Sequence, residues 1–412
     1  MSNPLLVGID VHRKTNTACL IDCQGQRAGP SFTVPNNLPG TETLAQKLTH
    51  QAQAGNHDRI LVAAEATGLY WWHLFCTLSR DPFLNQWPLE LYPLNPRATA
   101  NFKKTFSNQD KTDPIDALVV ADRLRLGRDL PAPFACHEPL LALRLLTRYR
   151  FHLIHALVQE KSYFLAYLYL KASEYTHLKP FTTTFGAASR AAIKQFASLE
   201  DIAAIPLQEL TEFIDAKGKR RFADPQANAR RLKQVAQDSY PLAPGLEEPL
   251  NLILDQSLQH IAFLERRIKR LDVAIDERLQ HIPHTLDTIP GIGPVFSAGI
   301  MAEIGDLSRF QCDEAKVAKF AGLTWRQTQS GDFRAQETRI SRCGNRYLRY
   351  YLCEAANSVR LCDPEYAAYY QRKHDEVPKH QHKRAIVLTA RKLVRLVVRL
   401  LTTNQPYRPR RT

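Results

Sequence analysis

The sequence predicts an α/β domain at the N-terminus, followed by two regions that are mainly helical. Short apolar runs at residues 5–9 and 60–64 are typical of buried strands. Helical patterns alternate with such runs through the first 130 residues, as in an open α/β sheet. Beyond that point the long patterns at 138–175 and 246–282 are helical, so the fold class is α/β plus α.

The elements of the first region have a recognisable order. We expect strands at residues 5–9, 17–21, 31–34, 60–64 and 89–94, and helices at 41–53, 69–78 and 114–126. Three early strands followed by alternating helices and strands are similar to the order of a ribonuclease-H-like sheet. That order would place Asp10, on the first strand, next to Glu65, on the fourth, at the centre of the sheet.

Four acidic residues are the main candidates for a functional site. Asp10 and Glu65 each end an apolar run, and carboxylates at strand ends gather at the sheet edge where ligands bind. Asp113 and Asp116 are three residues apart, so one helix face can present both. Convergent acids stay ionised only if cations neutralise them. We therefore expect Mg²⁺, which prefers oxygen ligands and bridges phosphate oxygens, and metal-dependent phosphoryl transfer on nucleic acid.

The same acids also fit structural roles. Asp113 precedes Pro114, so it could be the N-cap of a helix whose first residue is proline. Asp116 would then lie where a carboxylate favours the helix dipole. Asp10 alone could end a strand and begin a turn.

Composition indicates a polyanionic partner. The chain has 412 residues, with 55 Lys and Arg against 41 Asp and Glu, for a net charge of +14, and this balance points to DNA or RNA. We expect no membrane span, because no apolar run of about 18 residues occurs. The N-terminus lacks a signal-peptide pattern, and the eight Cys lack zinc-site spacing, so we expect a cytoplasmic protein with reduced thiols.

Three domains are expected, at residues 1–130, 131–283 and 284–412. In the middle domain two long helices flank an insert at 179–240, which indicates an antiparallel coiled-coil arm or a dimerising helix pair; an ordinary helical bundle is the alternative. The last domain opens with Pro290-Gly291-Ile292-Gly293-Pro294, similar to a helix-hairpin-helix turn that offers backbone N–H groups to phosphate. A purely structural turn remains open there.

Several segments together resemble the DEDD transposases of insertion sequences, relatives of the Piv-type DNA invertases. They are Gly8-Ile9-Asp10-Val11-His12, Glu65-Ala66-Thr67-Gly68, Lys111-Thr112-Asp113-Pro114-Ile115-Asp116-Ala117, Pro290-Gly291-Ile292-Gly293-Pro294, Ser330-Gly331 and Ile340-Ser341-Arg342-Cys343-Gly344-Asn345-Arg346-Tyr347-Leu348-Arg349. The resemblance implies a RuvC-like domain, a coiled-coil arm and a C-terminal transposase domain. It also implies an acidic tetrad of Asp10, Glu65, Asp113 and Asp116, and guidance by a structured bridge RNA from the element itself.

The resemblance further implies that Ser330 is a nucleophile. The chain departs from the family pattern nearby, because Gln329 stands where relatives often have a second serine and Asp332 replaces a common glycine. Ser341 is the competing candidate. The implied reaction is Mg²⁺-dependent cutting and rejoining of DNA through a covalent phosphoserine.

The implied partners are the element ends, target DNA, bridge RNA and further copies of the chain, as a dimer or tetramer, in a bacterial nucleoid. Two alternatives remain open. One is a RuvC-like, metal-dependent nuclease of the Holliday-junction resolvase type, which needs the tetrad and water but no Ser330. The other is a non-catalytic nucleic-acid-binding assembly protein.

Overall fold

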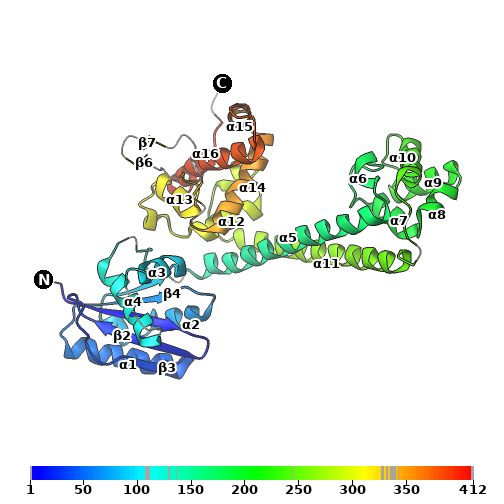
Figure 1. Ribbon diagram of the computed structural model, residues 1–412. Coiled ribbons are helices and arrows are strands. Elements are labelled where there is room, and N and C mark those ends of the chain that lie inside the picture. The colour runs from blue at the N-terminus through cyan, green and yellow to red at the C-terminus, as the bar shows by residue number, and fades with distance from the viewer. Residues whose placement is uncertain are drawn as a thin grey trace. The chain divides into compact units, whose positions relative to one another are not determined.

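The structure is a computed structural model. It describes residues 2–106, 112–128, 130–135, 137–243, 245–325, 329–330, 333–334, 340–341 and 343–409. The chain divides into two compact units, Met1–Leu141 and Ala142–Thr412 (Figure 1). Each unit is described by itself below.

A five-stranded sheet forms the centre of the first unit. Its strands are β1 (Pro4–Val11), β2 (Thr15–Ile21), β3 (Phe32–Pro35), β4 (Arg59–Glu65) and β5 (Leu89–Leu94). They lie in the order β3-β2-β1-β4-β5. The first three strands pair in antiparallel fashion, whereas β4 pairs parallel to both β1 and β5. All five expected strands are confirmed within two residues at each end.

Helices cover both faces of this sheet (Figure 1). On one face α1 (Leu38–Ala54) and α2 (Tyr70–Leu78) pack against alternate residues of β1 and β4. On the other face lies α4 (Asp113–Leu126). A short helix that the sequence did not predict, α3 (Pro96–Lys103), follows β5; only Thr99 of it is buried, so it has no apolar periodicity to detect.

The close packing of α4 depends on Gly8. Leu5, Val7 and Ile9 face α1 and α2, so Leu6 and Gly8 face α4. A Cβ on Gly8 would lie 2.1 Å from the Ala117 carbonyl oxygen. The missing side chain therefore lets α4 lie directly on β1.

Two long helices run antiparallel in the second unit. They are α5 (Glu138–Lys171) and α11 (Glu247–Leu279), which share one apolar core (Figure 1). Ion pairs fix their register: Arg150 Nε lies 2.5 Å from Asp272 Oδ1, and Lys161 Nζ lies 2.9 Å from Glu265 Oε1. The expectation of two long helices flanking an insert is confirmed.

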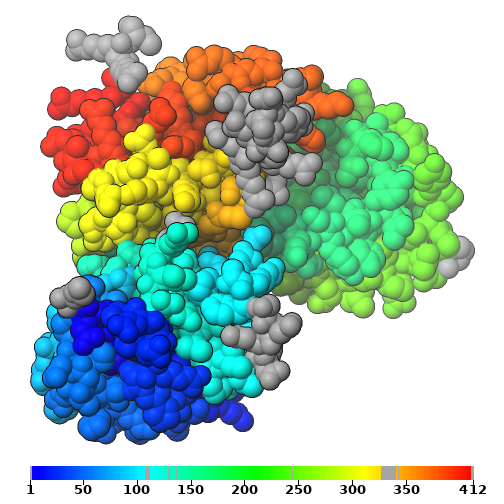
Figure 2. Space-filling view, turned by 60° about the vertical axis from the view of Figure 1, so that its left-hand side comes forward, coloured from blue at the N-terminus to red at the C-terminus, as the bar shows by residue number. Residues whose placement is uncertain are grey.

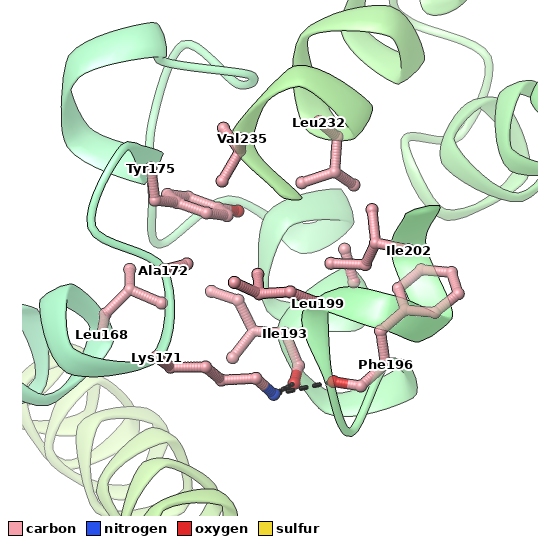
Figure 3. Close-up of a pocket in the computed structure, with 11 residues that line it drawn as sticks. Leu168, Lys171, Ala172, Tyr175, Ile193, Phe196, Leu199, Ile202, Leu232 and Val235 are labelled. Atoms are coloured by element: carbon pink, nitrogen blue, oxygen red, sulfur yellow. Dashed lines mark hydrogen bonds between the residues drawn. The ribbon is translucent and has the colours of Figure 1, made fainter. Parts of the chain in front are cut away.

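The insert is a small helical cluster with a buried lysine. Its helices are α6 (Tyr175–Leu178), α7 (Ala187–Gln195), α8 (Leu199–Ala204), α9 (Leu207–Lys217) and α10 (Pro225–Asp238). Lys171 lines an apolar cavity of this cluster and donates a hydrogen bond to Phe196 O at 2.7 Å (Figure 3). It also donates to Asn251 Oδ1 at 2.6 Å. Burial lowers the pKa of Lys171 to about 8. This lysine joins α5 to α11 and to the chain just after α7.

The remaining elements form a helical body around α14. They are η2 (Leu286–Thr288), α12 (Pro294–Ile304), η3 (Leu307–Phe310), α13 (Glu314–Ala321), β6 (Gln329–Ser330), β7 (Phe333–Arg334), α14 (Arg346–Cys362), α15 (Pro364–Asp375) and α16 (Gln381–Thr403). Among them, α14 contacts α12, α13, α15 and α16; these helices are yellow to red in Figure 2. Within the described residues, none of the helices combines the length and apolar character needed to cross a bilayer.

Candidate active site

The parallel pairing of β1 and β4 sets two carboxylates beside each other. Ile9 pairs with Ala64, so the next residues, Asp10 and Glu65, lie at the same level near the ends of the two central strands. Asp10 is two residues beyond Gly8 and shares its face, which is covered by α4. The alternative of a turn at Asp10 is wrong, because Asp10 lies within β1 and pairs with Thr17 of β2.

Helix α4 brings the other two acids to this edge. Thr112 has extended backbone angles and is the N-cap, so Asp113 is the first helical residue and Pro114 the second. The alternative of Asp113 as N-cap is therefore wrong by one residue. No side-chain hydrogen bond caps α4, and neither aspartate is used to hold the helix end. Both carboxylates in the first turn still favour the helix dipole.

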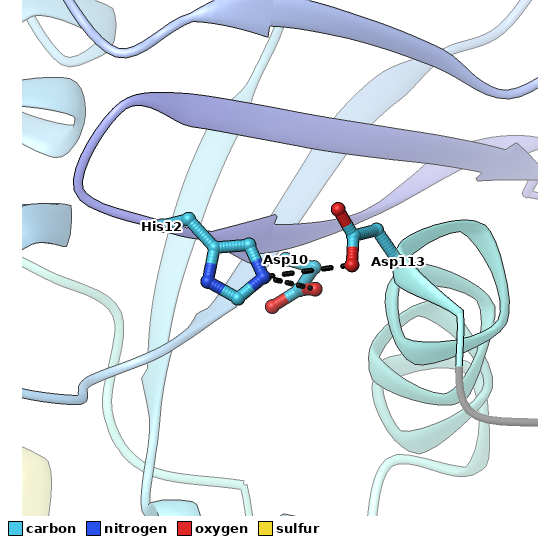
Figure 4. A group of neighbouring side chains, drawn as sticks. All are labelled: Asp10, His12 and Asp113. Atoms are coloured by element: carbon cyan, nitrogen blue, oxygen red, sulfur yellow. Dashed lines mark ion pairs between the residues drawn. The ribbon is translucent and has the colours of Figure 1, made fainter.

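His12 links two of the acids (Figure 4). Its Nε2 lies 3.2 Å from Asp10 Oδ2 and 3.6 Å from Asp113 Oδ1. One ligand atom from each of the three residues lies within 4.8 Å of the others. The sequence-based candidates did not include His12, although its position two residues after Asp10, at the end of the same strand, is a usable signal.

The acids are coupled electrostatically. Burial raises the pKa of Asp10, and Asp116 and Asp113 raise it further, while His12 opposes the shift. Burial likewise raises the pKa of Glu65, with added contributions from Asp10 and Asp116. Asp10 thus lies within electrostatic range of the other three predicted tetrad residues.

A lysine lies at the same edge. Lys103, at the end of α3, pairs with Asp116 and opposes the rise in the pKa of Glu65. It was not predicted, because α3 itself carries no detectable pattern. Among the described residues, one lysine and one imidazole interact with this group of four carboxylates, so acidic groups are in excess there.

This donor set fits a divalent cation. Carboxylate oxygens are the preferred ligands of Mg²⁺ and Mn²⁺, and an imidazole is acceptable to Mn²⁺. The side chains of Asp10 and Asp116 are 17% and 25% exposed, so solvent compensates their mutual repulsion only in part. A bound cation would offset that repulsion and bring the raised pKa values back down.

The two serine candidates lie in the second unit. Ser330 is in β6, which pairs with β7 so that Ser330 is opposite Phe333. The side chains of Gln329 and Ser330, and the whole of Gly331 and Asp332, lie outside the part of the chain that the structure describes. Ser341 Oγ accepts a hydrogen bond from Cys343 N at 3.3 Å, and its own N–H donates to Thr324 O. Ser341 therefore has a local structural role.

The glycine-rich hairpin forms a tight turn before α12. Ile292 N donates to Ile289 O, and Gly291 has φ +92°. A Cβ on Gly291 would come within 2.9 Å of the Ser358 backbone, so this glycine is needed for packing against α14. Gly293, the N-cap of α12, has no such neighbour.

Comparison with known proteins gives two family matches. A model of DEDD transposases of the IS110 type matches residues 7–170, which include all four acids. A model of the IS116/IS110/IS902 transposase family matches residues 283–371, which include both serines. Together they span more than half of the chain.

Individual relatives agree with these matches. An uncharacterized 44.8 kDa protein of insertion element IS116 from Streptomyces clavuligerus is 26% identical over 76% of each chain. An uncharacterized 42 kDa protein of insertion element IS900 from Mycobacterium paratuberculosis is 26% identical over 75% of each. A probable family 20 transposase of Pseudomonas aeruginosa is 29% identical over 40% of this chain and 49% of its own. The chain belongs to the IS110 family of DEDD transposases of insertion elements.

Proposed function

We propose that this transposase cuts and rejoins DNA with a divalent-metal site built from Asp10, Glu65, Asp113 and Asp116. The observation that carries the proposal is the meeting of these four acids at one edge of the sheet, from β1, β4 and α4. The order β3-β2-β1-β4-β5, with β2 antiparallel and β4 parallel to β1, supports a ribonuclease-H-like domain of the RuvC type.

Each residue has a defined part in this proposal. Mg²⁺, when bound, would polarise phosphate oxygens and stabilise charge that develops on them. Asp10 and Glu65 hold it from rigid strands, while Asp113 and Asp116 hold it from the first turn of α4. Lys103 orients the Asp116 carboxylate through their ion pair. Because Gly8 keeps α4 against β1, all four carboxylates are fixed by backbone packing.

Ser330 is the proposed nucleophile of the same reaction. Its hydroxyl loses a proton, its oxygen bonds to phosphorus, and a deoxyribose oxygen leaves and takes up a proton. The phosphoserine conserves the bond energy for rejoining. The match of residues 283–371 to a transposase model includes both serines, and the local hydrogen bonds of Ser341 support Ser330 over Ser341.

Guidance and assembly complete the proposal. An RNA from the element supplies sequence specificity, and a protein of net charge +14 holds the RNA and DNA backbones. The long helices pair subunits into a dimer or tetramer. Leu145, Tyr149, Tyr163 and Leu170 of α5 are each 43–57% exposed, and their spacing is compatible with a second apolar seam.

The test is recombination of the DNA that flanks the gene, together with RNA transcribed from it. We expect Asp10→Ala or Glu65→Ala to abolish recombination while the fold, measured by circular dichroism, persists. Recombination at the wild-type rate by either variant would rule out the metal site. Sequencing of copurified RNA tests guidance: only random cellular RNA, with DNA binding indifferent to ribonuclease, would exclude it.

A further inference from the structure

Two guanidinium groups of the second unit converge over one glycine. Arg144 of α5 and Arg309 of η3 both reach Gly305, the residue that ends α12. A Cβ placed on Gly305 would lie 3.5 Å from Arg144 Nη2 and 3.9 Å from Arg309 Nη1. Gly305 has φ +66° and ψ −137°, a conformation that side-chain-bearing residues rarely adopt. The space that a side chain at position 305 would occupy is therefore bordered by two positively charged groups.

The neighbouring carboxylates are committed elsewhere. Glu303 is fully buried and accepts hydrogen bonds from Arg148 Nε and Nη2 at 2.7 and 2.9 Å, and from Asn345 Nδ2 at 2.6 Å. Asp306 accepts from the backbone N–H and the hydroxyl of Ser308. Among the residues that the structure describes, three guanidinium groups thus share two carboxylates, and no ion pair joins Arg144 or Arg309 to either of them.

Both arginines are held in place by contacts that leave donors to spare. Within the described part of the chain, Arg144 donates a hydrogen bond through its Nε, to Ala302 O at 2.7 Å, and through no other nitrogen. Arg309 stacks on Phe310 and Phe320, with its guanidinium carbon 4.6 and 4.7 Å from the ring centres. Both residues keep partial solvent exposure. The two Nη groups that converge on Gly305 are therefore oriented, and the nearby carboxylates of Glu303 and Asp306 offset their charge only in part.

The electrostatics agree with this geometry. Burial and the proximity of Arg144 lower the pKa of Arg309 to about 10, while Glu303 and Asp306 oppose the shift. Burial also lowers the pKa of Arg144. A buried charge that is only partly compensated is costly to the fold, and a bound anion would reduce that cost.

We propose that Arg144 and Arg309 bind a phosphate group of a nucleic-acid strand. Guanidinium groups match phosphate oxygens in geometry and charge, and phosphate contacts position a strand without reading its sequence. The location suits this role: the Phe320 carbonyl accepts from Asn345 N at 2.6 Å, and Asn345 also binds Glu303. The site therefore lies at the base of the segment between Phe320 and Asn345, which carries Ser330.

The first test measures binding by the full chain without divalent metal, so it is independent of the proposed catalytic chemistry. Fluorescence anisotropy with a labelled random-sequence duplex DNA, and separately a single-stranded RNA of equal length, gives the salt dependence of affinity. We expect Arg309→Gln and Arg144→Gln to reduce the slope of log K against log salt by about 0.9 for duplex DNA or about 0.7 for a single strand.

The matched control is Arg372→Gln, on α15, which also removes a guanidinium stacked on an aromatic ring, 5.2 Å from Tyr369. If the salt slope falls more than in the control for DNA but not for RNA, the bound phosphate belongs to DNA. If it does so for RNA but not for DNA, the phosphate belongs to RNA. A larger fall with both nucleic acids means that the site accepts a phosphate of either. Slopes indistinguishable from the control with both nucleic acids overturn the proposal.

A second measurement uses the wild-type protein, in case either variant misfolds. Phenylglyoxal modifies accessible arginines, and mass spectrometry of the digested protein locates the modified residues. Bound DNA or RNA is expected to protect Arg144 and Arg309 several-fold. Unchanged modification of both arginines at saturating DNA and RNA would refute the phosphate site, whatever the outcome for the metal centre.

Discussion

Adding one methyl group at Gly8 should displace the helix that carries two carboxylates of the candidate active site. The new Cβ would lie 2.1 Å from Ala117 O and 2.3 Å from Ala121 N, where ordinary contacts begin at 3.4 Å. Both neighbours are backbone atoms of α4, so no side-chain rotation can relieve the overlap. The helix must move away from β1 by roughly 1 Å, and Asp113 and Asp116 move with it.

This displacement has two measurable consequences. Overpacking of this kind costs about 1–3 kcal/mol in the free energy of unfolding. A shift of about 1 Å in the functional groups can lower activity about 100-fold. Because Asp10 and Glu65 stay on the strands, Gly8→Ala should separate the two pairs of carboxylates and weaken binding of a divalent cation.

Urea unfolding and calorimetric titration with Mn²⁺ check this prediction. The matched control is Gly293→Ala, because a Cβ at Gly293 meets no atom within 4 Å. We expect the control to keep the wild-type Mn²⁺ affinity and to lose no more than about 1 kcal/mol of unfolding free energy, because Gly293 is the N-cap of α12 and Ala is less favourable there. If Gly8→Ala kept both the wild-type unfolding free energy and the wild-type Mn²⁺ affinity, the argument that close packing of α4 builds the site would fail.

Three further predictions follow from buried or reactive groups. In the folded state the pKa values of Asp10 and Glu65 are raised above their ordinary values of 3.8 and 4.5, so the folded chain binds more protons than the unfolded chain. Without metal, the unfolding free energy should therefore fall as pH rises through the folded-state pKa values. The fall should be less steep in Asp10→Asn. Folding lowers the pKa of Lys171 from 10.5 to about 8, so the unfolded chain binds more protons than the folded chain between these pH values. The unfolding free energy should therefore rise by roughly 3 kcal/mol from pH 8 to pH 10.5. Urea unfolding of Lys171→Met should lack this rise. Ser330→Ala should bind DNA normally yet form no denaturant-resistant adduct, while Ser330→Cys should form it weakly; a phosphonucleotide found by mass spectrometry on the Ser341 peptide alone would reassign the nucleophile.

Much of the first unit could be predicted because burial leaves a direct pattern in the sequence. Runs such as residues 5–9 and 60–64 are apolar because β1 and β4 are covered on both faces. The strand-end rule then led to Asp10 and Glu65. The register of β1 and β4, which sets the two acids at one level, required the structure.

Other parts of the site had no comparable signal. Lys103 comes from α3, whose exposed surface leaves no periodicity, and its ion pair with Asp116 joins two helices. The helix start at Asp113 was misplaced by one residue, because Thr112 and Asp113 are both acceptable N-caps and only the backbone angles decide between them. The convergence of Arg144 and Arg309 joins residues 165 positions apart, beyond the reach of any local pattern.

The most direct test of the metal centre is calorimetric titration of the full chain with Mn²⁺ and Mg²⁺, comparing the wild type with Asp10→Asn and Asp113→Asn. These substitutions keep size and remove charge, so the fold should persist. The four-carboxylate site predicts saturable binding by the wild type and at least about a tenfold loss of affinity in each variant, by analogy with the 10–100-fold effects of altering residues around metal sites. Equal affinity in all three proteins, or no saturable binding by the wild type, would contradict it.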